Sequence, residues 1–270
     1  MPIYIDRHYL EDATKQSLSD AHEKDIHIQD KYSCTFLTYW FDEDRSTAFC
    51  LVDAPSKDAI CKAHDEAHGD VPHEILEVDP SIVESFLGRM SDPEPDETTG
   101  QVEHDSAFRA VMFTDLKDST LMTSMYGDEK ALHLVHVHNA IVRNALREFG
   151  GSEIKHTGDG IMASFANILN SVNCGKEIQK GFAKHNANNP DESLFVKIGI
   201  SAGEPIEEHG DLFGIAVQLS ARLCSFAQAG DILVSDLVYQ SCANPDLFLQ
   251  DSEYAEMKGF LQKKEVYRVR

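Results

Sequence analysis

The amino-acid sequence predicts an α+β protein built from two domains. Its 270 residues exceed the length of about 100 to 150 residues that is typical of one domain. Runs that alternate like strands and runs with helical spacing follow one another along the chain. With 42% hydrophobic and 26% charged residues, the composition is that of a globular protein and excludes a wholly disordered or collagen-like chain.

A short segment rich in proline and acidic residues separates the two predicted domains. Residues 91–100 read SDPEPDETTG and contain nothing to bury, which is typical of an exposed linker. We therefore predict a first domain over residues 1–88, a linker over 89–104 and a second domain over 105–270.

The elements expected in the first domain follow the order β-α-β-β-α-β. Alternating or β-branched runs predict the strands, and polar runs of helix-forming residues predict the helices between them. Strands are expected at 2–9, 34–41, 46–53 and 73–78, and helices at 12–29, 56–68 and, more briefly, 82–87. This order of elements is the ferredoxin-like one.

The second domain is predicted to be a mixed α/β unit with a mostly antiparallel sheet. Strands are expected at 108–114, on either side of the turn Gly158-Asp159-Gly160, and at 194–202, 232–235 and 266–269. Helices are expected at 129–149, 171–185 and 216–227. The pair Gly150-Gly151 ends the first of these helices.

Charge and cysteine usage exclude several classes of function. The 24 basic and 46 acidic residues leave a formal net charge of −22, which repels nucleic-acid phosphates and anionic membranes. The six cysteines show no C-x-x-C spacing, which fits a reduced compartment. The N-terminus has no signal-peptide pattern, and no run approaches the roughly 18 apolar residues of a membrane span. We expect a cytoplasmic protein with neither nucleic acid nor membrane as partner.

Two aspartates in the second domain stand where a metal site is expected. Asp115 ends the apolar strand in FTDLKDST, and Asp159 occupies the tip of the turn in KHTGDGIMASF. Adjacent strands would bring the two carboxylates together, and such a pair can share two magnesium ions that bind triphosphate oxygens. Taken alone, each aspartate is more often a turn former.

A third segment adds further polar residues at a regular spacing. GDLFGIAVQLSARLC, residues 210–224, places Asp211 before a turn and then Gln218 and Arg222 on one helix face. Over residues 105–270 the chain resembles the class III nucleotidyl cyclases, the catalytic domain of adenylate and guanylate cyclases. The resemblance rests on the strand-end aspartate, on Lys-x-x-Gly-Asp, on Asp-x-x-Gly followed by a polar residue and arginine, and on the closing KGFLQKKEVYRV.

This resemblance implies a ferredoxin-like core that pairs head to tail into a homodimer with composite active sites. It implies that Asp115 and Asp159 bind two magnesium or manganese ions. Lys155 and Asp211 of the partner chain would read the adenine edge of the nucleotide. A carboxylate accepts from the exocyclic amine of adenine but repels the oxygen of guanine, so ATP is the expected substrate.

The implied reaction converts ATP into 3′,5′-cyclic AMP and pyrophosphate by attack of the ribose 3′ oxygen on the α-phosphate. Gln218 would orient the ribose, Arg222 would stabilise the transferring phosphate, and Lys258 would reach the triphosphate. Two departures bear on activity: the family commonly has Asn where Gln218 stands, and Gly where Asp118 stands in the phosphate-facing loop. A catalytically weak or inactive nucleotide-binding module therefore stays open as an alternative.

Histidines in the first domain indicate a second candidate ligand site. His64 and His68 lie four residues apart on a predicted helix, with Cys61 one turn earlier, a spacing that can chelate nickel, zinc or copper. Solvated histidines on an acidic surface helix are the plainer interpretation. Residues 1–87 also resemble small ferredoxin-like domains, some described as nickel-responsive, through Arg7-His8, an Ala-Pro-Ser and the helix with its histidines. We expect a sensor or regulatory domain; a metal sensor that uses the cyclase-like region only to dimerise is a further alternative.

Other reactive side chains of the second domain are interpreted as structural. His133, His136 and His138 of the helix at 129–149 are expected on the surface or in packing, because no cysteine or acid nearby completes a site. Cys224 is expected to be a small buried hydrophobe.

Overall fold

The computed structural model of the chain describes residues 1–94, 102, 104–205, 207–208, 211–242, 244–249 and 251–270. They form two compact units, Met1–Phe108 and Arg109–Arg270. Most of the predicted linker core, residues 95–101 and 103, lies outside the described residues, and the boundaries at 88 and 105 stay predictions.

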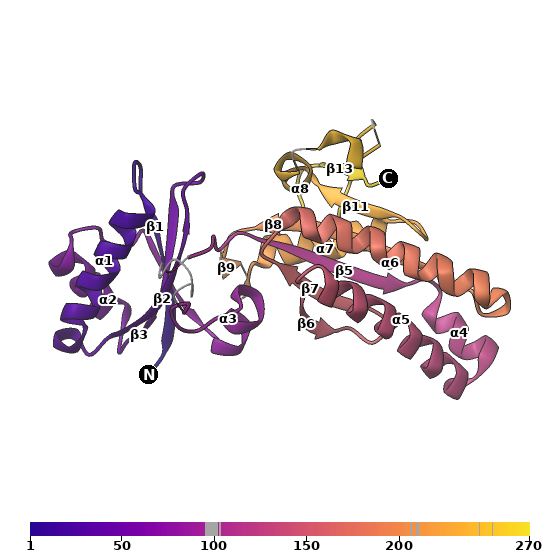
Figure 1. Cartoon of the computed structure of the whole chain (residues 1–270), viewed down its shortest axis with the longest axis horizontal. Coiled ribbons are helices and arrows are strands. Elements are labelled where there is room, and N and C mark those ends of the chain that lie inside the picture. Colours follow the sequence, from indigo (N-terminus) through magenta and orange to yellow (C-terminus); the bar gives the residue numbers. More distant parts are fainter. Residues whose placement is uncertain (95–101, 103, 206, 209–210, 243, 250) are drawn as a thin grey trace. The chain divides into compact units, whose positions relative to one another are not determined.

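The first unit is a four-stranded antiparallel sheet in the order β2-β3-β1-β4, with helices on both faces (Figure 1). Helices α1 and α2 cover one face and α3 the other. This strand order confirms the ferredoxin-like prediction. The elements are β1 (Ile3–Tyr9), α1 (Lys15–Ile28), β2 (Thr35–Asp42), β3 (Thr47–Asp53), α2 (Lys57–Ala67), β4 (Glu74–Val78) and α3 (Pro80–Leu87), with a 3-10 turn at Gln29–Tyr32.

Local signals in the sequence explain where the helices of this unit begin. Thr14 caps α1 in a capping box with Ser17, and the Ser56 side chain accepts from the backbone of α2. Asp79 caps α3, whose first residue is Pro80, and Gly88 ends that helix in the left-handed region. The core lies between the sheet and α1 and α2, and its buried members include Tyr4, Leu18, Phe36, Tyr39, Phe41, Val52 and Ile60.

The second unit is a seven-stranded sheet in the order β12-β13-β11-β8-β5-β7-β6. Its part β8-β5-β7-β6 repeats the ferredoxin-like order, and only β11 pairs in parallel, with β8. The main elements are β5 (Arg109–Leu116), α4 (Ser119–Tyr126), α5 (Asp128–Glu148), β6 (Ser152–His156), β7 (Ile161–Phe165), α6 (Ile168–Asn188), β8 (Val196–Gly203), α7 (Gly214–Phe226), β11 (Ile232–Ser235) and β13 (Lys264–Arg268). Shorter pieces are β9 (Glu207–Glu208), β10 (Asp211–Leu212), α8 (Asp236–Ser241), β12 (Glu253–Ala255) and 3-10 turns at Pro190–Glu192 and Pro245–Leu247.

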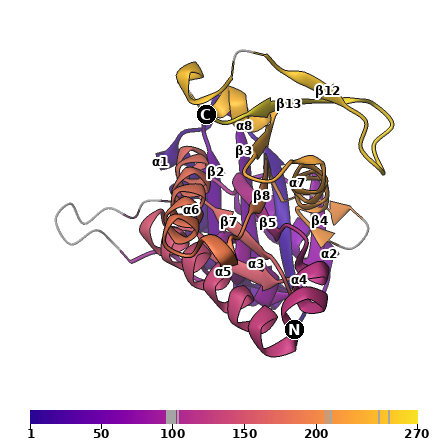
Figure 2. The same ribbon diagram turned by 90° about the vertical axis from the view of Figure 1, so that its right-hand side faces the viewer.

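Helix α7 packs very closely on the large sheet, on the face opposite α5 and α6 (Figure 2). A Cβ atom added at Gly199 would stand 2.2 Å from the backbone nitrogen of Cys224, so only glycine permits this approach. The Ser220 hydroxyl contacts the carbonyl oxygens of Val111 at 2.7 Å and of Gly199 at 2.8 Å. These contacts fix α7 against β5 and β8.

One helix of the second unit differs from the sequence prediction. No helix was predicted between the strand at 108–114 and the helix at 129–149, but Ser119–Tyr126 form α4. The helix starts after Asp118, which has φ 58°, and no side chain caps it. Asp118 precedes the helix but makes no capping hydrogen bond, and only Met122 of this short helix is buried, so the pattern missed it.

The six cysteines are all free thiols, as the scattered spacing predicts. Cys61 of α2 is half-buried, and the others are buried: Cys34, Cys50, Cys174, Cys224 and Cys242. Among the described residues, no helix is both long and apolar enough to cross a membrane.

Candidate functional site

The two aspartates predicted to bind metal come together at one end of the large sheet. Asp115 is the last residue but one of strand β5. The backbone amide of the next residue, Leu116, donates to the carbonyl oxygen of Asp159 at 3.1 Å. Gly160 permits this approach, because a Cβ there would stand 2.0 Å from the Thr114 carbonyl oxygen. Asp115 and Asp159 are called the paired aspartates below.

Each of the paired aspartates has a polar partner on a neighbouring element. Lys197 of β8 stands opposite Asp115 in the strand register, and its Nζ lies 2.5 Å from Asp115 Oδ2. Partial burial lowers the pKa of Lys197, but the hydrogen bond and charge of Asp115 outweigh it, so that this pKa is raised overall. The Ser119 hydroxyl donates to Asp159 Oδ2. Sequence reasoning missed Lys197, although a single lysine in the apolar run VKIGIS was its signal.

The backbone is strained at Asp118, the residue directly before α4. Asp118 occupies the left-handed region at φ 58° and ψ 27°, with an exposed side chain 3.7 Å from Lys117 Nζ. Glycine adopts this conformation without the steric cost that a Cβ brings. The N-terminus of α4 follows at once and lies beside Asp159 through Ser119, so its backbone amides face the region where an anion is expected.

The residues predicted to hold the nucleotide lie on other elements of the same unit. Lys155 is exposed on β6, and Gln218 lies partly exposed on α7. Arg222 of α7 donates from Nε to the carbonyl oxygen of Lys258 at 3.0 Å, which brings these two predicted residues together. Asp211 begins β10, and its side chain lies outside the part of the structure that is described.

The described contacts therefore form two separate groups. Asp115 and Asp159 share one end of the sheet with Lys197, whereas Arg222 of α7 contacts Lys258. No contact described for this chain joins either member of the second group to the paired aspartates.

A series of hydrogen-bonded polar side chains begins at Thr114, the residue before Asp115. His138 of α5 is 0% exposed, with Nδ1 2.9 Å from Asn139 Oδ1 and Nε2 3.4 Å from Thr114 Oγ1. Asn139 Nδ2 lies 3.0 Å from His156 Nε2 on β6. Burial lowers the pKa of His138, so this ring is neutral. His138 thus belongs to packing, and His133 and His136 are exposed, as predicted.

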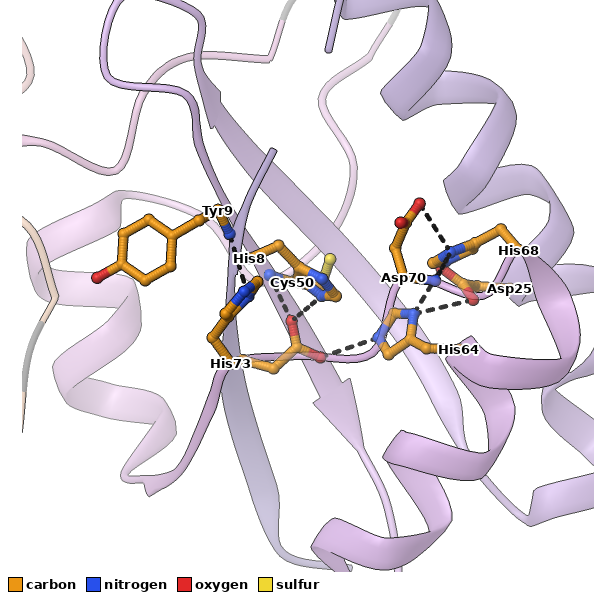
Figure 3. A network of polar contacts seen from close by, with 9 residues as sticks. His8, Tyr9, Asp25, Cys50, His64, His68, Asp70 and His73 are labelled. Atoms are coloured by element: carbon orange, nitrogen blue, oxygen red, sulfur yellow. Dashed lines mark hydrogen bonds and ion pairs between the residues drawn. The ribbon is translucent and has the colours of Figure 1, made fainter. Parts of the chain in front are cut away.

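In the first unit, His64 of α2 and His68, the residue that follows this helix, are part of a largely buried network (Figure 3). His64 is 1% exposed, and its Nε2 lies 3.0 Å from Asp6 Oδ2 on β1. On its other side Nδ1 lies 3.1 Å from both Asp25 Oδ1 on α1 and Nε2 of His68, which itself lies 3.3 Å from Asp25 Oδ2. The interpretation of these histidines as solvated surface residues is wrong, because α2 turns them inward against β1 and α1.

The charges in this network are mutually compensating. Burial lowers the pKa of His64, but the charge of Asp6 and the hydrogen bonds to Asp25 and Asp6 outweigh it and raise this pKa to about 10. Burial raises the pKa of Asp25, yet hydrogen bonds from His64 and His68 lower it overall. Two carboxylates thus face the two ring nitrogens of His64, an arrangement in which a cation can replace a proton.

The same residues form two overlapping sets of metal-ligand atoms. One set is Asp6, His8, Cys50 and His64, and the other is Asp25, His64 and His68; within each set the ligand atoms lie within 4.8 Å of one another. Cys61, which the spacing also suggested, belongs to neither set.

A cavity of about 100 Å³ opens beside the second set. Its lining includes Asp25, Cys50, His64 and His68 together with His22 of α1. One polar atom of these side chains, His22 Nδ1, is buried without a hydrogen-bond partner among the described residues. Buried polar atoms are rarely left unpaired, so the cavity fits a ligand that satisfies this nitrogen.

Two family models match the chain. The model described as adenylate and guanylate cyclase catalytic domain matches residues 103–270, and the model described as nickel responsive protein SCO4226-like matches residues 4–78. The adenylate cyclase of Podospora anserina is 31% identical over 182 residues, which are 57% of this chain and 8% of that protein. The chain spans 24% or less of the length of the first curated relatives it matches.

Solved structures share the fold of the second unit. The adenylyl cyclase CyaB from P. aeruginosa superposes with a TM-score of 0.52 at 21% identity, covering 60% of this chain and 93% of that one. The guanylyl cyclase Cya2 superposes with a TM-score of 0.54 at 20% identity, covering 60% and 91%. The second unit therefore has the class III cyclase fold that the motifs predict.

Proposed function

Because the chain belongs to the adenylate and guanylate cyclase family through residues 103–270, we propose that it is an adenylate cyclase that forms 3′,5′-cyclic AMP and pyrophosphate from ATP. The observation that carries the proposal is the junction of β5 with the β6–β7 turn, where the bond from Leu116 to Asp159 brings Asp115 beside Asp159. Curated relatives at 31% and 33% identity, from Podospora anserina and Mycosarcoma maydis, are adenylate cyclases and support ATP as the substrate.

The paired aspartates would hold two magnesium or manganese ions. The donor set fits these ions, since two carboxylates at the end of one sheet supply the hard oxygen ligands that such ions prefer. When bound, the ions would lower the pKa of the attacking hydroxyl and offset charge on the phosphoryl oxygens. Lys197 holds the Asp115 carboxylate in place and balances its charge.

The chemical step is an in-line displacement at the α-phosphorus of ATP. A bond forms from the ribose 3′ oxygen to phosphorus, and the bond from phosphorus to the bridging oxygen of the β-phosphate breaks. The hydroxyl proton passes to water, and pyrophosphate leaves with the bonding electron pair. Gln218 would orient the ribose, and Arg222 would stabilise charge on the transferring phosphate. Lys258, whose carbonyl Arg222 contacts, would bind the triphosphate.

The base would be read by residues of a second chain in a homodimer. Lys155 would donate to a ring nitrogen of adenine, and Asp211 would accept from its exocyclic amine. The separation of the described contacts into two groups within one chain supports a site composed across a two-fold axis.

The test is product formation by the purified full-length chain with ATP or GTP and either magnesium or manganese, resolved against cyclic nucleotide standards. We expect cyclic AMP from ATP, loss of product in Asp115→Asn, and unchanged product in the control Asp246→Asn, an exposed aspartate of the second unit. Cyclic GMP from GTP alone would overturn the choice of substrate. No product from protein shown to be dimeric would instead support the nucleotide-binding module, and ATP affinity would then be measured.

A second function is favoured by the buried cluster of the first unit, a response to nickel, zinc or copper. We propose that the ion binds Asp25, His64 and His68, called the ion site below. Asp6 holds Nε2 of His64, which leaves Nδ1 toward His68 in the carboxylate–histidine–metal arrangement. Two imidazoles and a carboxylate suit these metals. Burial keeps the pKa of Cys50 well above its usual value, so the protonated thiol makes the alternative set a poorer ligand.

Titration of the full-length chain with nickel, zinc and copper salts, followed by calorimetry and metal analysis, tests the ion site. We expect one ion per chain, and an affinity about 10- to 100-fold weaker in His68→Gln. The control is His27→Gln, an exposed histidine of α1, with melting temperatures recorded for both variants. Equal affinities in wild type and His68→Gln would reject this site.

A further inference from the structure

Two of the residues that line the cavity beside the ion site also contact residues near the end of the first unit. His22 of α1 and Tyr39 of β2 line this cavity, with ring centroids 5.0 Å apart. His22 lies one helical turn before Asp25, so both side chains are on the same face of α1. The ion site and these two rings therefore line the same cavity.

His22 connects the cavity to the chain that follows α3. The residue is 7% exposed, and its Nε2 lies 3.2 Å from Asp92 Oδ2. Its other ring nitrogen, Nδ1, is buried and has no hydrogen-bond partner among the described residues. One nitrogen of this ring thus holds Asp92, while the other is available to a ligand in the cavity.

Tyr39 connects the same cavity to the other side of the predicted linker. Its ring stacks on the His104 ring with centroids 3.7 Å apart and an angle of 13° between the planes. Its carbonyl oxygen lies 2.9 Å from His104 Nδ1 and also accepts from Arg89. Displacing the Tyr39 ring would therefore disturb the stacking on His104, while the hydrogen bond to the Tyr39 carbonyl oxygen holds His104 against β2.

From His104 onward the chain runs along β2 into the first strand of the cyclase unit. The Phe41 amide donates to the Asp105 carbonyl at 3.1 Å, and Ser106 donates to Asp42 Oδ2 at 2.6 Å. Strand β5 begins three residues later, at Arg109, and carries one of the paired aspartates near its end. The backbone thus runs from His104, which stacks on a residue that lines the cavity, to a predicted catalytic metal ligand.

We propose that occupancy of the ion site is transmitted to the cyclase unit through His22 and Tyr39, which hold Asp92 and His104 on either side of the predicted linker. This inference rests on the ion site proposed above. An ion in the cavity engages Nδ1 of His22, directly or through its bound water, and fixes the proton on Nε2. Nε2 then donates to the carboxylate of Asp92, as metal-bound histidines donate to a second carboxylate. The occupied cavity therefore tightens the attachment of Asp92, and the Tyr39 ring, 5.0 Å from His22, holds His104 at the start of the segment that leads into β5.

Hydrogen exchange in the full-length chain tests the structural part of this proposal. The reporter is the Phe41 amide, which exchanges when its bond to Asp105 opens. We expect the ion to slow exchange in peptides that contain Phe41 by at least about threefold in wild type, since an attachment is stabilised. The double variant Asp92→Ala/His104→Ala should show no such slowing, and Glu94→Ala, a neighbouring exposed acid, should behave like wild type. Equal slowing in the double variant would overturn the proposal.

The activity arm measures cyclic AMP formation with and without the ion at a fixed, saturating magnesium concentration. We expect the rate to change at least twofold in wild type and Glu94→Ala. The double variant should keep its basal rate and bind the ion more weakly, because Asp92 is removed, and at a saturating ion concentration it should show a ratio within error of one. His68→Gln should also lose the response, which separates the ion site from any effect of the same metal at the paired aspartates. A wild-type rate that is unchanged by a bound ion would overturn the inference.

The two proposals fail in different ways. If the wild-type chain binds no ion, the proposed ion site is contradicted, and so is the inference that rests on it. A chain that binds the ion but forms no cyclic nucleotide contradicts the proposed activity, while exchange at Phe41 still decides the coupling. A chain that binds the ion and makes cyclic AMP, but whose double variant responds like wild type, contradicts only the inference.

Discussion

Asp118 combines two unfavourable properties at one position of the phosphate-facing loop. Its backbone is in the left-handed region at φ 58°, which costs a residue with a Cβ about 1–2 kcal/mol. Its exposed carboxylate stands at the start of α4, where the resemblance to cyclases predicts that the triphosphate binds. Glycine would remove both the strain and the charge, whereas alanine would remove the charge alone.

We predict that Asp118→Gly raises kcat/KM for ATP several-fold and leaves the protein at least as stable as wild type. Asp118→Ala should show a similar gain in kcat/KM, because the charge is also gone, but lower stability by about 1 kcal/mol relative to the glycine variant. Steady-state kinetics and urea unfolding of both variants check this. If neither variant gains activity, the loop charge does not oppose substrate.

His138 contributes a pH dependence of stability whose sign follows from its environment. Burial lowers its pKa in the folded protein, whereas in the unfolded chain the pKa is about 6.5. The unfolded chain therefore binds more protons as the pH falls below about 6.5, and its contribution to stability is lost as the pH approaches the lower folded value.

We predict that the free energy of unfolding falls less steeply between about pH 7 and pH 5 in His138→Gln than in wild type. Glutamine keeps a polar side chain near Thr114 and Asn139 but does not titrate. Urea unfolding at several pH values measures the slope, and His133→Gln on the exposed face of α5 is the control. Equal slopes in wild type and His138→Gln would contradict a neutral, buried ring at this position.

At the level of elements, periodic patterns predicted most of the fold. Strand β11 occupies residues 232–235 as predicted, and α5 and α2 differ by a residue or so from the expected helices. Helix α4 was missed because a non-glycine residue at positive φ precedes it and no cap marks its start. Signals of this kind depend on a backbone conformation that the residue types do not determine.

Some residues of the candidate sites could be predicted from the sequence and others could not. Motif spacing identified the paired aspartates and the pair His64 and His68, because these residues lie close together in sequence or within recognisable segments. Lys197 and Asp25 could not be identified, since they depend on the register of β8 against β5 and on the packing of α1 against α2. Solvated histidines were the wrong interpretation because composition alone does not show which face of a helix is buried.

The close approach of α7 to the sheet gives an element-level prediction. In Gly199→Ala the new Cβ would lie 2.2 Å from the Cys224 backbone nitrogen, so α7 must move away, and Gln218 and Arg222 move with it. We expect a loss of several kcal/mol of stability, in the range of overpacked cores, and a large loss of activity. The control Gly175→Ala in α6 meets only the Ile232 side chain at 3.4 Å and should be nearly neutral. Melting curves and initial rates decide; a wild-type-like Gly199→Ala would contradict the packing.

For the whole molecule, a site shared by two chains makes a distinctive prediction. Asp115→Asn and Arg222→Ala should each be inactive alone, but an equal mixture should recover about a quarter of wild-type activity. Half of the dimers are then mixed, and each mixed dimer has one intact site of two. The measurement is the rate of cyclic AMP formation after mixing and re-equilibration. No recovery, with subunit exchange demonstrated, would place both residues in a site within one chain.

The burial of the cysteines has a practical consequence for tests of the proposed ion site. Burial raises the pKa of Cys34 to about 11 and those of Cys174 and Cys224 to about 12, and Cys50 and Cys242 are buried as well. The pKa of Cys61 is also raised, by burial and by the charges of Asp6 and Asp58, but this thiol is the most exposed of the six, so a thiol-directed fluorophore should attach there, one turn before His64 on α2. The natural sequence thus supplies a single labelling position beside the ion site, and quenching by a paramagnetic ion would report its arrival in real time without any engineered cysteine.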